Sequence, residues 1–319
     1  MKYLSIVVRV AVIFICFSCL YMMRTDILNG LKTTIHYLAL WWLIPILFLS
    51  FTNLITEPSR WYLLFSVTGN HQSIKKLYHI FMVIALGSCT LPFRMGLPLR
   101  LFLIHSKLGV SFATTTSFLL IDTILSYGMW LFFALIGILF LFWGFGPASA
   151  IPIVSIAFLT VAGIIFILQK QHVMPEFMAK RFGELQTQLA IIKFIPWISR
   201  TSMIMIFDIF VYSFRHFLIL TALDIHLSFF SVIMMVAIGF CGGLLSMMPM
   251  GLGGYDLSTV FMLMHLGVPR ECAILVPVIE RFVMLSSSVI FGSISLHELH
   301  ISWKSFKTLP AFFGKKVFI

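Results

Sequence analysis

The chain has 319 residues, of which 60% are hydrophobic and 10% are charged, and its mean hydropathy is +1.05. This composition excludes an ordinary soluble protein and is typical of a protein that crosses a membrane many times. A spanning helix needs roughly 20 apolar residues, so the length allows about six to eight spans and excludes a fused soluble catalytic module. The net charge of +11 lies mainly in short loops, which favours positive-inside topology over nucleic-acid binding.

Six apolar runs are long enough to cross a bilayer. The first of them has the basic start of a signal peptide but no small-x-small cleavage site, so we interpret it as a span. The five cysteines lie in apolar stretches and predict no disulfide framework. In chain order the six predicted spans are 4–23, 35–55, 112–143, 151–168, 202–223 and 272–296.

Two further apolar stretches, 78–105 and 229–265, are interrupted in the middle by proline and glycine. Proline removes a backbone hydrogen-bond donor and glycine weakens a helix. We therefore expect each stretch to form two short helices around an unwound centre. The first centre is the segment 91–98 and the second is the segment 248–256.

The basic residues predict the orientation of the chain in the membrane. If the N-terminus, the segments 57–77, 106–111 and 169–201, and the tail are cytoplasmic, 14 of the 22 Lys and Arg residues lie inside. This assignment requires both broken stretches to be re-entrant hairpins, one entering from each side. The expected location is the cytoplasmic membrane, with both termini in the cytoplasm and residues 297–319 as a basic cytoplasmic tail.

The sequence also matches itself at an offset of 158 residues, about half its length. Three crossings separate the two hairpins, so the halves would be inverted, a pattern found in transporters with a midplane binding site. The predicted fold is thus an all-α polytopic membrane protein with about six spanning helices and two Pro/Gly-broken re-entrant hairpins. Its inverted repeats would be residues 1–148 and 149–296. The matching pairs are Gly96 with Gly254, Asp122 with Glu280, and 108–110 with 266–268.

At these residues the chain resembles the flippase-like transmembrane domain of lysylphosphatidylglycerol synthases, the multiple peptide resistance factors. The resemblance implies two re-entrant helices and movement of a lipid across the bilayer. The aminoacyl-transferase part of those synthases is not in this sequence, so a stand-alone form without lysyl transfer is expected. The resemblance rests on Arg60-Trp61, Pro92-x-Arg94-x-Gly96-x3-Arg100, Leu108-Gly109-Val110, Tyr212 to Leu220, Pro249-x-Gly251-x-Gly253-Gly254, Leu266-Gly-Val-Pro and Glu280-Arg281.

Three positions depart from the family pattern. The family often has Glu where this chain has Leu97, often Arg where it has Thr123, and usually Glu where it has Asp256. A coupling role for the first of these glutamates therefore does not carry over to this chain, and its substrate can differ.

Arg94 and Arg100 lie in the first broken stretch, in a segment otherwise able to sit in hydrocarbon. A charge at that depth costs a few kcal/mol unless it is paired or hydrated, and a guanidinium binds phosphate through two parallel hydrogen bonds. We therefore expect these arginines, with Gly96, to bind the phosphate of a lipid head group. The alternatives are snorkelling to the interface or a structural pair with Asp122.

In the second broken stretch, Gly251, Gly253 and Gly254 leave the backbone uncovered, and Asp256 follows them. Free amides at a helix N-terminus favour an anion, which makes this segment a second candidate for substrate binding. Asp256 is equally suited to cap its own helix, and the glycines to allow close helix packing.

Several ionisable residues lie inside predicted spans, where such residues usually face the protein interior and pair. Glu280 would carry a proton if its surroundings raised its pKa, and a static ion pair is the simpler alternative. We expect this group to form coupling or structural ion pairs. Its members are Asp122, Asp208, Arg215, Glu280 and Arg281.

No cofactor or metal is expected, because His297 and His300 lie at the end of a span and are more typical of an interfacial pair, and the pair Cys16 and Cys19 lies in an apolar run. The sequence favours a non-enzymatic lipid flippase for an anionic phospholipid or a polyprenyl-phosphate-linked lipid. The alternatives are a membrane-embedded lipid or polyprenyl-phosphate transferase, or a non-catalytic partner of a lipid synthase. Expected partners are the anionic lipid, the membrane, and either a second copy or a partner synthase, without nucleic acid.

Overall fold

The computed structural model describes residues 40–67, 72–90, 96–144, 149, 151–156, 194–246 and 251–302. All regular secondary structure in these ranges is helical, which confirms the predicted all-α class. The predicted span 4–23, most of the span 151–168, Arg94 and the tail from residue 303 lie outside the described residues.

Helix α3 (Leu43–Val67), which follows the short helix η1 (Leu40–Trp42), is longer than the sequence predicted. The predicted span ended at residue 55, with a cytoplasmic loop from residue 57. Instead, α3 continues through Glu57, Pro58 and Arg60. The loop prediction was wrong because charged residues were taken as a sign of exposure, whereas here Glu57 and Arg60 pair with partners on other helices.

Among the described residues, three helices are long and apolar enough to cross a membrane. They are α6 (Phe112–Trp143), α9 (Phe194–Ala222) and α12 (Arg270–Glu298), and they correspond to three of the predicted spans. Helix α6 begins where the Ser111 side chain accepts a hydrogen bond from the Thr114 amide, and it ends at Gly144, whose φ of 69° suits glycine.

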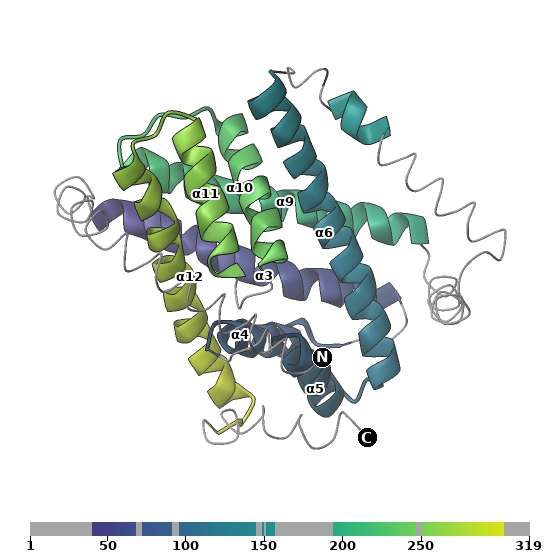
Figure 1. Ribbon diagram of the computed structural model, residues 1–319. Helices are drawn as coiled ribbons and strands as arrows, with labels where there is room; N and C mark the ends of the chain where they lie inside the picture. The colour runs from purple at the N-terminus through teal and green to yellow at the C-terminus, as the bar shows by residue number, and fades with distance from the viewer. Residues whose placement is uncertain are drawn as a thin grey trace, which may run out of the picture.

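Each Pro/Gly-interrupted stretch forms two helices, as predicted. The first hairpin consists of α4 (Ile74–Thr90) and α5 (Gly96–Leu108), and the second of α10 (Phe229–Leu245) and α11 (Gly254–His265). The two helices of each pair pack against each other (Figure 1). Whether each pair enters and leaves the membrane on one side stays a prediction.

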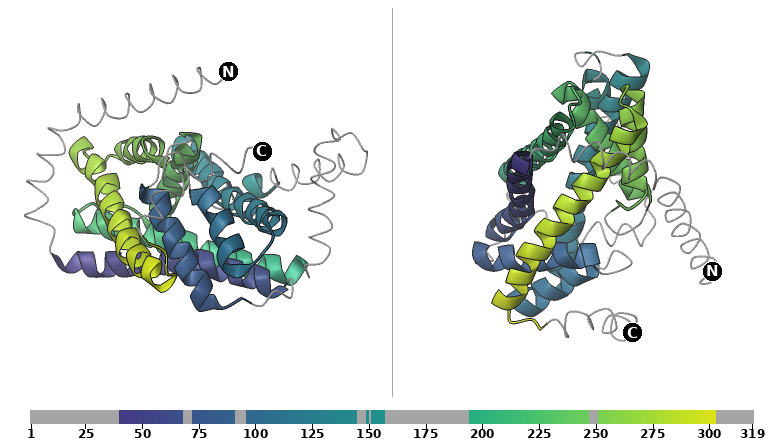
Figure 2. Two further views of the ribbon diagram at one scale, coloured as in Figure 1. Left: turned by 90° about the horizontal axis from the view of Figure 1, so that it is seen from below. Right: turned by 90° about the vertical axis from the view of Figure 1, so that its left-hand side faces the viewer.

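The packing of the helices repeats between the two halves. Helix α4 packs on α12, α10 packs on α6, and α3 packs on α9. In Figure 1, α6 and α12 stand on opposite sides of the bundle, and the right-hand view of Figure 2 shows α12 running along it. Gly96 and Gly254 begin equivalent helices, as do Phe112 and Arg270, each pair at the offset of 158 residues at which the sequence matches itself.

Two hydrogen bonds repeat in the same way. Lys107 Nζ donates to the Leu299 carbonyl oxygen at 2.9 Å, and His265 Nε2 lies 3.1 Å from the Leu141 carbonyl oxygen. Both residues of one contact are 158 positions from their counterparts in the other, with the halves exchanged, as a twofold axis requires. Since α12 begins at Arg270 and Leu299 follows its end, Lys107 and Arg270 lie at opposite ends of α12.

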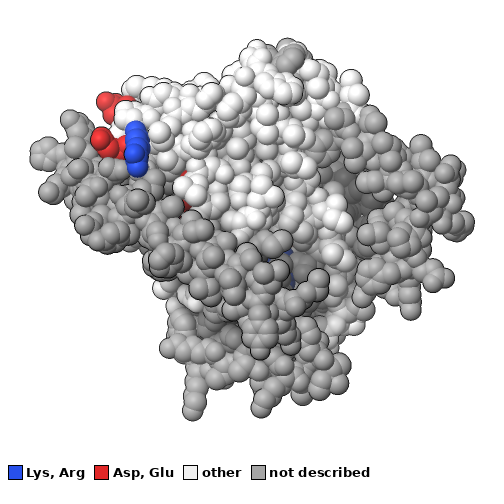
Figure 3. All heavy atoms as spheres, in the orientation of Figure 1, with Lys and Arg blue, Asp and Glu red and all other residues white. Residues whose placement is uncertain are grey.

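The outer surface of the described helices is apolar. Figure 3 shows a face on which the described atoms are almost all uncharged, with Lys, Arg, Asp and Glu gathered at one corner. Such a surface would aggregate in water and suits hydrocarbon. The exposed large side chains include Phe48, Ile124, Leu131, Phe207, Phe261, Phe282 and Ile290.

Candidate functional site

A half-open cavity of about 440 Å³ lies between helices of both halves. Both hairpins reach it, the first with Gly96 and Arg100 and the second with Gly251 and Tyr255. Helices α3, α9 and α12 contribute polar and charged side chains to the lining, beside apolar residues such as Leu54, Trp130 and Phe240. The polar and charged side chains include Ser50, Asn53, Thr56, Glu57, Arg60, Asp208, Arg215, Glu280 and Arg281.

Asp122 on α6 is the centre of a buried cluster in the first half. Arg60 Nε lies 3.1 Å from its Oδ1, Arg100 Nη1 lies 3.8 Å from its Oδ2, and Trp61 Nε1 donates to Oδ2 at 3.2 Å. The Asp122 side chain is 7% exposed. A carboxylate so far from water requires such partners, and here two cations and one neutral donor surround it.

Arg100 on α5 is held between aromatic rings as well as carboxylates. Its guanidinium carbon lies 5.6 Å from the centre of the Trp61 ring and 5.1 Å from that of Phe81, and Nη2 donates to Glu57 Oε1. Cation–π contacts of this kind fix the plane of the guanidinium. Arg100 therefore contacts two acids, Glu57 and Asp122, as the structural-pair alternative requires for Asp122.

The equivalent cluster in the second half is the pair of Arg215 on α9 and Glu280 on α12. Arg215 Nε donates to Glu280 Oε2 at 3.0 Å, and Nη2 donates to Oε1, so the contact is bidentate. Both side chains are 1% exposed. Removing either partner would leave the other charge buried alone, which makes this pair a structural element of the helix bundle.

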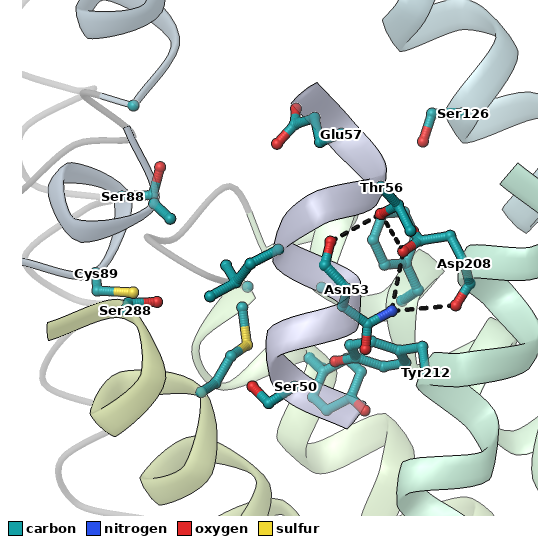
Figure 4. A pocket seen from close by; sticks show the side chains of 18 of the residues that line it. Ser50, Asn53, Thr56, Glu57, Ser88, Cys89, Ser126, Asp208, Tyr212 and Ser288 are labelled. Carbon is teal, nitrogen blue, oxygen red and sulfur yellow. Dashed lines mark hydrogen bonds between the residues drawn. The ribbon is translucent and has the colours of Figure 1, made fainter. Parts of the chain in front are cut away.

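Asn53 on α3 joins the predicted residues Asp208 and Arg215. It accepts from Arg215 Nη1 at 2.9 Å through Oδ1, and its amide nitrogen donates to Asp208 Oδ1 at 2.9 Å. Thr56, one turn further along α3, donates to the same Asp208 oxygen at 2.5 Å. Figure 4 shows Asn53 and Thr56 facing Asp208, whereas Glu57 leaves α3 on the other side. The Asn53 side chain thus links Asp208 and Arg215, which lie seven residues apart on α9.

Asp256 caps its own helix and also pairs. Its Oδ2 accepts from the Gly253 amide at 3.0 Å, and its Oδ1 accepts from Arg281 Nε at 3.0 Å. The capping alternative is therefore observed. Gly251 and Gly253 have φ of 69° and 78°, which favours glycine, and a Cβ on Gly254 would lie 2.3 Å from the Gly242 carbonyl oxygen.

His216 lies beside this network and did not stand out in the sequence. Its Nδ1 is 2.9 Å from the Tyr212 carbonyl oxygen, which can only accept, so Nδ1 carries the proton. Nε2 therefore accepts from the Tyr255 hydroxyl at 2.7 Å and lies 3.9 Å from Glu280 Oε2. His216 therefore links Tyr255 of the second hairpin to α9, next to the Arg215–Glu280 pair.

The structure brings most of the predicted residues together. Asp122 pairs with two of the arginines that line the cavity, Arg60 and Arg100, and Asp256 pairs with a third, Arg281. The predicted residues that line the cavity themselves are Gly96, Arg100, Asp208, Arg215, Gly251, Glu280 and Arg281. Sequence reasoning missed Asn53, Glu57, His216 and Tyr255 as site residues and named Arg60 and Tyr212 only within family motifs. A signal existed for two of them, because Glu57 and Arg60 are three apart and share one helix face.

Comparison with known protein families identifies the family of this chain. A family described as the lysylphosphatidylglycerol synthase TM region matches residues 6–292, which is most of the chain. Comparison with curated proteins found no match. The family, the apolar spanning helices and the apolar exterior make this a membrane protein with a lipid-related role. The chain belongs to the family of the lysylphosphatidylglycerol synthase transmembrane region.

Proposed function

We propose that the protein is a flippase that moves an anionic phospholipid or a polyprenyl-phosphate-linked lipid across the cytoplasmic membrane. One observation carries this proposal: a cavity lined by four arginines and several acids lies inside a bundle whose outer surface is apolar. Charged side chains within a membrane protein usually mark the path of a polar substrate. A lipid head group would cross through the cavity while its chains stay in the bilayer.

The proposal uses the two hairpins as the parts that receive the head group. If the Pro/Gly centres of the hairpins are unwound, as the sequence predicts, their backbone amides can face only protein or a hydrated cavity within the membrane. We propose that Arg94, Gly96 and Arg100 bind the phosphate from the first hairpin. Gly251, Gly253, Gly254 and Asp256 would contribute from the second, and the ion pairs of Asp122, Asp208, Arg215, Glu280 and Arg281 would hold the helices or couple transport to an ion.

The proposal also includes the division of the chain. Residues 1–148 and 149–296 would be inverted repeats with 297–319 as a cytoplasmic tail, and a head group would reach the cavity from either leaflet as one repeat moves against the other. The shared helix starts and the paired contacts of Lys107 and His265 support this division.

Purified protein in proteoliposomes tests the function. Fluorescent phosphatidylglycerol is placed in both leaflets, and a membrane-impermeant quencher reports the fraction that reaches the outer leaflet over time. We expect phosphatidylglycerol to exchange between the leaflets faster than in protein-free liposomes. For a lipid without phosphate, such as a fluorescent diacylglycerol-linked sugar, we expect a smaller increase over its own protein-free rate. Equal rates with and without protein for phosphatidylglycerol and for polyprenyl phosphate would contradict the proposal.

A further inference from the structure

Glu57 differs from the other acids of the cavity network in its burial and its contacts. Its side chain is 35% exposed, compared with 7% for Asp122 and 1% for Glu280. Asp122 accepts from Trp61 and has the cations Arg60 and Arg100 beside it, and Glu280 has the bidentate Arg215, but Glu57 contacts Arg100 through one oxygen. Asp256, which is 26% exposed, also accepts from the Gly253 amide, so Glu57 is the acid that can leave its arginine at the smallest cost.

Arg100 is held in place by residues other than Glu57, so it could exchange Glu57 for another anion without moving. Trp61 and Phe81 fix the guanidinium plane, and Asp122 lies 3.8 Å from Nη1. Within the described part of the chain, the buried Nε of Arg100 has no hydrogen-bond partner. The edge formed by Nε and Nη2 is therefore occupied by one carboxylate oxygen, although its geometry suits two oxygens of one anion.

Arg60 adds a second donor group at the same wall. Its Nε is close to Asp122 Oδ1 but is not aligned to donate to it, and that nitrogen has no hydrogen-bond partner among the described residues. Arg60 lines the cavity together with Glu57 and Arg100. The wall therefore contains two buried guanidinium groups with unused donors, which is an expensive arrangement unless an acceptor visits.

We propose that Glu57 is an internal substitute for the phosphate of the substrate. In the structure its carboxylate occupies Arg100, and an incoming phosphate displaces it and binds the Nε and Nη2 edge of Arg100 beside Arg60. One anion replaces another, so the charge around the arginines is conserved and neither guanidinium is ever buried alone. When Glu57 returns, it displaces the phosphate and promotes release. This inference rests on the proposed function and names a phosphate-bearing head group as the ligand.

The main test compares Glu57→Gln with the wild-type protein in detergent. The probes are dihexanoylphosphatidylglycerol below its micelle concentration and inorganic phosphate, and calorimetry gives Kd for each. Glutamine keeps the size of Glu57 but loses the charge that competes for Arg100, so we expect Kd for the lipid to fall about tenfold. If Kd for inorganic phosphate falls as well, the site recognises the phosphate alone. If Kd falls for the lipid but not for inorganic phosphate, the site recognises the head group together with its glycerol. Either result supports the inference.

The matched control is Glu271→Gln, the same change at an exposed glutamate at the start of α12, where Kd should not change. If Glu57→Gln leaves Kd unchanged or raises it, Glu57 is a structural partner and the inference is wrong. If the glutamine variant does not fold, Glu57→Asp replaces it. The shorter carboxylate should reach Arg100 poorly and again lower Kd, and an unchanged Kd would overturn the inference.

Flux measurements separate this inference from the proposed function. In proteoliposomes, Glu57→Gln should bind the lipid more tightly but transport it more slowly at saturation, because release loses its competitor. Wild-type protein that shows Glu57-dependent phosphate binding without any flux would contradict the flippase proposal alone. Flux that does not change in Glu57→Gln, together with unchanged binding, would contradict the inference alone.

Discussion

At the scale of single residues, buried charge in this protein is arranged twice. Arg60 on α3 pairs with Asp122 on α6, and Arg215 on α9 pairs with Glu280 on α12. The acids are 158 residues apart, and the arginines are within one helical turn of the same offset. The second pair is closed by its bidentate geometry, whereas the first shares its acid with Arg100. The open cluster suits substrate binding and the closed one suits structure.

Arg100→Gln should abolish lipid flux while the protein stays folded. Glutamine cannot present the guanidinium edge to a phosphate, and Arg100→Lys should restore flux only in part, because lysine keeps the charge without the fork. Melting temperature and proteoliposome flux are measured on both variants and on Arg100→Gln combined with Asp122→Asn. A purely structural pair predicts that the double variant regains both stability and flux, and that result would retire the phosphate site.

The hydrogen bond between Tyr255 and His216 should be measurable as a coupling energy. Tyr255→Phe leaves the buried Nε2 of His216 without its donor, which costs about 1–3 kcal/mol of unfolding free energy. His216→Phe removes the acceptor of Tyr255 at a similar cost. The double variant should lose less than the sum of the two, by at least about 0.5 kcal/mol. Chemical unfolding in detergent gives the values, with Tyr62→Phe on an exposed face as the control. Strict additivity would show that the contact contributes nothing.

At the scale of helices, glycines decide how closely the two arms of a hairpin approach. A Cβ on Gly254 would meet the Gly242 carbonyl oxygen at 2.3 Å, and one on Gly96 would meet Ser88 Oγ at 2.0 Å. Gly254 faces backbone, which cannot yield, whereas Gly96 faces a side chain that can rotate. The second hairpin is therefore the more sensitive to any added volume.

Gly254→Ala should destabilise the protein by about 1–3 kcal/mol, because the arms of the second hairpin must separate to admit the methyl group. Gly128→Ala is the matched control, since it lies within α6 and a Cβ there would meet nothing within 4 Å. It should be neutral or stabilising, by up to about 1 kcal/mol. Thermal unfolding of both variants measures the difference. Equal melting temperatures would mean that α10 and α11 do not pack at the observed distance.

The helices were easier to predict than the contacts between them. Hydropathy and the Pro/Gly breaks located α6, α12 and both hairpins, because these signals are local in the sequence. The end of α3 was missed, because the partners of Glu57 and Arg60 come from α5 and α6 and no local pattern reveals them. His216 and Tyr255 were missed for the same reason. A charged residue next to an apolar run marks a loop when it is exposed, but it can lie within a helix when a residue of another helix pairs with it.

At the scale of the whole molecule, the packing relates two halves by an exchange of equivalent helices. Helix α4 of the first half packs on α12 of the second, and α10 of the second packs on α6 of the first. The cavity lies where these swapped elements meet, and both hairpins reach it. Movement of one half against the other would therefore alter the walls of the cavity, as the proposed transport would need.

The same arrangement predicts a topology that is open to direct measurement. Helix α12 begins at Arg270, and the residue after its end contacts Lys107, so the loops at 106–111 and near 270 lie at opposite ends of a helix of 29 residues. At about 1.5 Å per residue, such a helix is longer than the hydrocarbon core of a bilayer. The distribution of basic residues predicts that the first loop lies in the cytoplasm and the second outside.

Single cysteines at Ser106 and Arg270, in a variant without the native cysteines, test this topology with a membrane-impermeant thiol reagent. Both positions are exposed in the structure, so accessibility should report the side of the membrane. Arg270→Cys should label in intact cells, and Ser106→Cys only after the membrane is permeabilised. Labelling of both from one side would mean that α12 does not cross the bilayer. The inverted relation of the two halves, and with it the route from one leaflet to the other through the cavity, would then be wrong.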